Sequence, residues 1–76
     1  MREKILEILS NIRPDIDFET EEGLITDKKL DSMDLILSVA AFSDELDVDI
    51  KPKDLLSENF DSLDDIVDLI KRLSEV

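Results

Sequence analysis

The 76-residue chain has room for one domain, spanning residues 1–76, and folding would bury only about 60% of its unfolded surface. It contains no Cys and no His, which excludes disulfides, thiolate metal sites, thiol nucleophiles and an imidazole base. Its net charge of −12, from 21 acidic and 9 basic residues, argues against nucleic-acid binding and favours partners with basic surfaces.

The N-terminal segment mixes charged and apolar residues over 1–7, unlike the uninterrupted apolar region of a signal peptide. No apolar run approaches the length of a transmembrane helix. We therefore expect a cytoplasmic, monomeric protein. Because any catalysis would rest on carboxylates alone, we also expect that it is not an enzyme.

Helical periodicity predicts a first helix over about 2–12, which Pro14 brings to an end. The inward-facing residues expected on it are Ile5, Ile8, Leu9 and Ile12. Residues 15–29 show no helical periodicity of apolar residues and contain the single glycine of the chain. This stretch is therefore predicted to be a long loop. The expected anchors of this loop in the core are Phe18, Leu24, Ile25 and Leu30.

A second helix is predicted over 32–46, one short turn over 53–57, and a last helix over about 62–73. The second helix should bury the face made by Leu35, Val39, Phe42 and Leu46. The last helix should bury Leu63, Ile66, Val67, Ile70 and Leu73. The expected fold is therefore all-α, a small bundle of three main helices and one short helix.

The second helix carries another apolar stripe, made by Met33, Leu37 and Ala40, almost opposite its predicted core face. Between the two stripes we place the polar residues Asp34, Ser38 and Glu45, while Ile36 borders the side of Met33. One interpretation is a partner-binding surface, since flexible Met side chains suit docking on several enzymes. The alternative is that the long loop folds over this stripe and makes it part of the core.

Two serines have nearly identical neighbours, at Ser32 and Ser62. Ser62 is followed at the third position by Asp65, which is the pattern of a helix-capping box. Ser32 lacks that explanation, because Asp31 is the better cap and leaves the serine in the first turn of the helix. An anionic modification there would be stabilised by the helix N-terminus, although an ordinary exposed serine explains the sequence as well.

The acidic residues do not form a calcium site of the EF-hand type. Asp15, Asp17 and Glu19 occupy its first, third and fifth places, but Thr20 stands at the sixth and Thr26 at the twelfth. We therefore expect a solvated acidic surface and no metal.

The whole chain resembles the acyl carrier proteins and their peptidyl and D-alanyl relatives. The resemblance rests on the order of the helices and on Leu30-Asp31-Ser32-Met33 at the start of the second one. It implies that Ser32 accepts 4′-phosphopantetheine from coenzyme A, and that the terminal thiol of this group holds an acyl or aminoacyl cargo as a thioester. Ser62 leaves too few residues after it to match the acceptor of the family.

The resemblance also implies partners: a phosphopantetheinyl transferase, an acyl- or amino-acid-activating ligase, and a downstream transferase or synthase. By position, Asp31 precedes the acceptor, Met33 matches the apolar docking residue after it, and Asp44 and Glu45 match the acidic end of the helix. Leu37 and Ala40 continue the docking surface. If the cargo is stored inside the bundle, we expect a cavity beside Ile36, Leu56 and Phe60.

Stand-alone aminoacyl carriers, D-alanyl carriers included, are what the chain resembles more closely in the stretches Gly23-Leu24-Ile25, Leu30-Asp31-Ser32-Met33 and Glu58-Asn59-Phe60-Asp61-Ser62-Leu63. Two departures argue against recognition by the enzymes of fatty-acid synthesis. Leu30 stands directly before Asp31, and Leu37 and Ser43 stand where those carriers usually have acidic residues. The alternative function is a small acidic helical adaptor that binds a partner through Met33 and Leu37 without a prosthetic group. Ser32 is indispensable to a carrier and incidental to such an adaptor.

Overall fold

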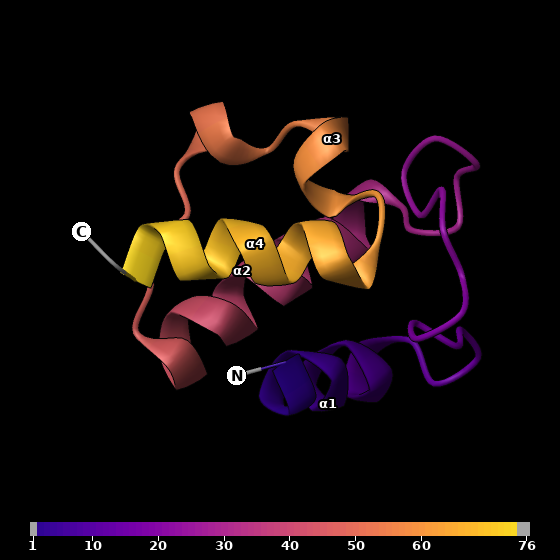
Figure 1. Cartoon of the computed structure of the whole chain (residues 1–76), viewed down its shortest axis with the longest axis horizontal. Helices are drawn as coiled ribbons and strands as arrows, with labels where there is room; N and C mark the ends of the chain where they lie inside the picture. Colours follow the sequence, from indigo (N-terminus) through magenta and orange to yellow (C-terminus); the bar gives the residue numbers. More distant parts are fainter. Residues whose placement is uncertain (1, 75–76) are drawn as a thin grey trace.

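The computed structural model describes residues 2–74 and shows an all-α fold (Figure 1). The elements are α1 (Arg2–Ile12), α2 (Ser32–Leu46), the 3-10 turn η1 (Pro52–Asp54), α3 (Ser57–Phe60) and α4 (Leu63–Ser74). α1 packs against α2 and α4, and α3 packs against α4. The predicted helical bundle is confirmed, and the boundaries of its three main helices lie within about a residue of those expected. Among residues 2–74, no helix has the length and apolar character needed to cross a membrane.

The connection between α2 and α4 differs from the prediction of one short turn over 53–57. It forms two pieces, η1 and α3, with Leu55 and Leu56 between them. Pro52 occupies the start of η1, where its fixed φ suits a turn and its missing N–H is not needed. The Asn59 side chain donates a hydrogen bond of 2.9 Å to the Asp54 carbonyl and so ties the two pieces together.

The predicted core faces of α1 and α4 are buried. Ile5, Leu9, Ile66 and Ile70 have no exposed surface, and Phe42 of α2 lies in the same cluster. Two residues at the helix ends, Ile12 and Leu73, pack only partly against it. The apolar periodicity of these two helices therefore decides where the core of the domain lies.

The long loop is held in place by both apolar and polar contacts. Phe18, Leu24 and Leu30 are buried, as expected, while Ile25 is partly buried. The Asp61 carboxylate, before α4, accepts hydrogen bonds from the backbone N–H groups of Ile25 (3.0 Å) and Thr26 (2.9 Å). These contacts fasten the loop to the start of α4.

The buried face of α2 only partly matches the prediction, because Phe42 is fully buried but Leu46 packs only partly against the core. Asp34 and Ser38 are buried with Phe42, whereas Leu35 and Val39 are only partly buried. The helix is thus rotated so that two polar side chains point inward. Arg13 supplies the reason, because it pairs with Asp34 from a position outside α2.

Candidate functional site

Asp31 and Asp34 together fix the first turn of α2. The Asp31 carboxylate accepts a hydrogen bond of 2.9 Å from the Asp34 N–H, and the Asp34 carboxylate accepts one of 3.1 Å from the Asp31 N–H. This reciprocal capping box satisfies backbone donors that a helix N-terminus leaves without partners. Ser32 follows as the first helical residue, and it is exposed. Its hydroxyl is therefore not needed for capping.

Ser62 has the opposite role. Its hydroxyl accepts a hydrogen bond of 3.1 Å from the Asp65 N–H in the first turn of α4. Phe60, two residues before it, is 1% exposed and packs in the core. The prediction that Ser62 is a helix cap is confirmed.

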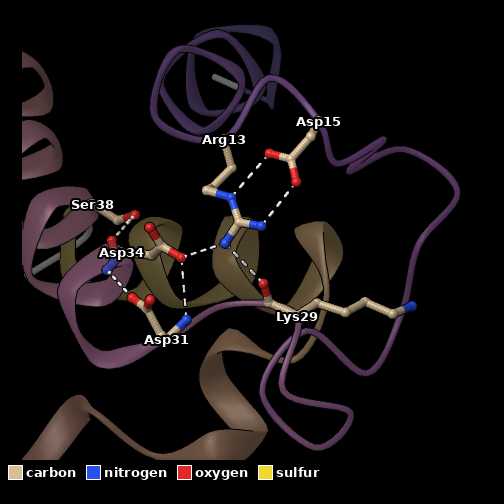
Figure 2. A network of polar contacts seen from close by, with 6 residues as sticks. All are labelled: Arg13, Asp15, Lys29, Asp31, Asp34 and Ser38. Carbon is tan, nitrogen blue, oxygen red and sulfur yellow. Dashed lines mark hydrogen bonds and ion pairs between the residues drawn. The ribbon is translucent and has the colours of Figure 1, made fainter.

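Arg13 connects the end of α1 with the end of the long loop and the start of α2 (Figure 2). Its Nη1 donates to the Asp34 carboxylate at 2.6 Å and to the Lys29 carbonyl at 3.0 Å. Its Nε and Nη2 donate to the two carboxylate oxygens of Asp15 at 3.0 and 2.9 Å. The hydrogen bonds to Asp15 and Asp34 raise the pKa of Arg13, and the same contact with Arg13 lowers the pKa of Asp15.

The apolar stripe beside Ser32 is open to solvent. Met33 is 61% exposed, Leu37 48%, and Ala40 is also exposed. The alternative in which the long loop covers this stripe is wrong, because the loop is anchored in the core and at Asp61 instead. Ile36, which sequence reasoning placed only at the border, is 62% exposed. Five exposed large apolar residues among those described gather on α2 and the segment after η1: Met33, Ile36, Leu37, Leu55 and Leu56.

An apolar groove of about 560 Å³ begins at Ser32 and follows α2. Its lining residues are Ser32, Leu35, Ile36, Val39, Ala40, Ser43, Asp49, Ile50 and Leu55. The cavity expected beside Ile36, Leu56 and Phe60 is thus found at Ile36 only. Phe60 belongs to the core, and the opposite wall comes from Ile50 and Leu55 because the chain after α2 folds back along the helix.

Asp44 and Glu45 are both exposed at the end of α2. Glu45 forms an ion pair of 3.1 Å with Lys4 of α1, and this hydrogen bond raises the pKa of Lys4. Within residues 2–74, Asp44 forms no ion pair, whereas a cation of a partner would have to compete with Lys4 for Glu45. An exposed pair of this kind contributes little to stability, so the competition would cost little.

Sequence reasoning included Ile36 in this region but missed Arg13 and Leu55. Two of the three partners of Arg13, Lys29 and Asp34, lie 16 and 21 positions away, so no local pattern reveals these contacts. The sequence indicated the exposure of Leu55 only weakly: it is an apolar residue in a predicted turn that is too short to bury it. Its place opposite Ile36 depends on the course of the chain after α2.

No protein-family model, curated protein or solved structure matches this chain. Its function has to be inferred from its own residues. Those residues combine an exposed serine in the first turn of α2, an apolar stripe beside it and a groove that begins at the same serine.

Proposed function

We propose that the chain is a carrier protein that holds an acyl or aminoacyl group as a thioester on 4′-phosphopantetheine attached to Ser32. One observation carries the proposal: Ser32 is exposed in the first turn of α2, where the apolar stripe and the groove both begin. A serine kept only for capping would direct its hydroxyl to the backbone, as Ser62 does. The exposure of Ser32 instead supports a role in reaction with a partner.

The surroundings of Ser32 suit a phosphodiester. The N-terminus of a 15-residue helix favours a negative group in its first turn. During transfer the Ser32 oxygen would form a bond to the pantetheine-linked phosphorus of coenzyme A. The pyrophosphate P–O bond would break, adenosine 3′,5′-bisphosphate would leave, and the hydroxyl proton would pass to a base of the transferase. The attached group supplies a thiol, which this Cys-free chain lacks.

The proposed partners are a phosphopantetheinyl transferase, an activating ligase and a downstream transferase or synthase. Met33, Leu37 and Ala40 would form the apolar centre of the docking surface, with Ile36 beside them. Asp44 and Glu45 would meet basic residues at its margin. Docking on an apolar stripe with few acids favours aminoacyl-activating partners, D-alanyl ligases among them. A cytoplasmic location, where coenzyme A is available, belongs to the same proposal.

Intact mass tests the proposal after incubation with coenzyme A and a broad-specificity phosphopantetheinyl transferase. We expect wild type and Ser62→Ala to gain one phosphopantetheine and Ser32→Ala to gain none. Far-UV circular dichroism of each variant confirms that it is folded. Absence of any gain in folded wild type, with several transferases tried, would overturn the proposal.

The second candidate is an acidic helical adaptor, which the exposure of Met33, Ile36 and Leu37 also supports. An adaptor would bind its partner through this face without a prosthetic group. Ser32→Ala would leave such binding unchanged, whereas Leu37→Glu would abolish it. Modification of Ser32 in the mass experiment would decide against this reading.

A further inference from the structure

The carboxylate of Asp34 is held in an unusual place for a charged group. Its side chain is only 11% exposed, and its Oδ2 accepts hydrogen bonds from both Arg13 and the Asp31 N–H. A buried carboxylate is tolerated where a cation and hydrogen-bond donors replace the lost water. Arg13 is that cation, and it lies outside α2, directly after α1.

The same guanidinium also fixes the chain that leads into α2. Its Nη1 donates to the Lys29 carbonyl, two residues before Asp31. Nε and Nη2 donate to Asp15, and these two bonds fix the plane of the guanidinium. In this orientation Nη1 points toward Asp34 and the Lys29 carbonyl (Figure 2). A lysine has a single ammonium and would not reproduce this fork of contacts.

Ser32 lies between the two residues that this network holds. Asp31 precedes it and Asp34 follows it by two positions, and their mutual hydrogen bonds close the first turn around it. The backbone at Ser32 is thus held by Asp31, Asp34 and, through Asp34, Arg13. Loss of Arg13 would leave the Asp34 carboxylate without its cation and loosen the turn.

We propose that Arg13 is a positioning residue for the transfer of phosphopantetheine to Ser32. This inference rests on the proposed carrier function. It adds a residue that follows the end of α1, whereas the acceptor Ser32 begins α2. Arg13 would not touch the reacting atoms. It would hold the first turn of α2 in the geometry from which the Ser32 oxygen attacks phosphorus, and displacements of about 1 Å in such geometry can cost on the order of 100-fold in rate.

The test compares Arg13→Ala with Arg2→Ala, which removes the same charge from the first residue of α1, whereas Arg13 follows the last residue of that helix. Arg2 pairs with Asp64 in the first turn of α4 and makes no contact with the capping box of α2. Under conditions where both variants are fully folded, we expect Arg13→Ala to lower kcat for modification by about 10-fold. KM for the carrier should change less than about twofold, because Leu37 and Ala40 of the docking stripe lie beyond the first turn of α2. Arg2→Ala should match wild type, and Arg13→Lys should recover part of the rate.

A second readout does not depend on modification. Amide hydrogen exchange at Asp31 and Asp34 should accelerate by about 10-fold in Arg13→Ala and remain unchanged in Arg2→Ala, because opening of the capping box exposes these donors. If Arg13→Ala is too unstable to assay, Asp34→Asn perturbs the same network while keeping the shape of the side chain. It should show the same fall in kcat.

Modification of folded Arg13→Ala at the wild-type rate would overturn the inference, as would an effect confined to KM. Failure of wild type itself to accept phosphopantetheine would overturn the proposed function as well. The two failures are distinguishable, since only the second one affects wild type.

Discussion

Two substitutions on α2 should separate the residues that hold the fold from those that remain available for a partner. Phe42→Leu and Leu37→Ala each remove three carbon atoms from the same helix. Phe42 has no exposed surface, whereas Leu37 is 48% exposed. The chemical change is therefore matched, and the burial of the removed atoms differs.

The magnitudes follow from the carbon atoms removed from apolar surroundings. At about 0.8 kcal/mol per buried carbon, Phe42→Leu should lower the free energy of unfolding by about 2 kcal/mol. About half of Leu37 is already in water, so Leu37→Ala should cost about 1 kcal/mol or less, and the helix propensity of Ala offsets part of this. A domain of this size is stable by about 4–11 kcal/mol, so the difference is measurable.

Urea unfolding followed by far-UV circular dichroism measures both values. With a slope of about 1 kcal/mol per molar urea, the midpoint should fall by about 2 M for Phe42→Leu and by less than about 1 M for Leu37→Ala. If Leu37→Ala cost as much as Phe42→Leu, Leu37 would be packed in solution. The stripe would then belong to the core and could not serve as a free docking surface.

Two further predictions concern charges at element ends. Hydrogen bonds from the N–H groups of Thr26 and Ile25 lower the pKa of Asp61. A lowered folded-state pKa stabilises the fold above the unfolded value of about 3.9, and this contribution is lost as the pH falls through the folded pKa. Urea midpoints between pH 6 and pH 2 should therefore fall less steeply for Asp61→Asn than for wild type, and parallel curves would contradict this assignment. Asp47 ends α2 with a φ of 54° and places a negative charge at the helix C-terminus. Asn also tolerates this φ, so Asp47→Asn removes only the charge and should raise the free energy of unfolding by about 0.5 kcal/mol at low salt. In thermal melts the gain should be smaller at about 1 M NaCl, because salt screens the charge. An unchanged or lowered melting temperature at low salt would refute this prediction.

The sequence was sufficient to predict the three main helices because their signals are local. Asp31 and Pro14 mark a helix start and a helix end through the backbone geometry that each residue type favours. The apolar periods of α1 and α4 likewise predicted which residues are buried. The role of Ser62 as a cap also followed from residues within three positions of it.

The rotation of α2 was not predictable in this way. A helical wheel weighs apolar residues and places Asp34 and Ser38 at the surface. The structure buries both, because Arg13 neutralises Asp34 and the Ser38 hydroxyl donates a hydrogen bond of 2.7 Å to the Asp34 carbonyl. The decisive contact joins residues 21 positions apart. Leu35 and Val39 consequently line the groove and are only partly buried.

The first half of α2 thus reverses the usual distribution of polar and apolar side chains. Asp34 and Ser38 are buried, while Met33, Ile36 and Leu37 are exposed. Stability alone would favour the opposite arrangement, since burying a carboxylate is costly and exposing large apolar groups adds nothing to folding. Natural sequences break local rules of this kind mainly where function requires it. The reversal coincides with the turn that carries Ser32, and it is absent from α1 and α4, whose apolar residues face inward. The free-energy cost of the buried carboxylate and the exposed apolar side chains of α2 is therefore concentrated at the proposed site of modification and docking.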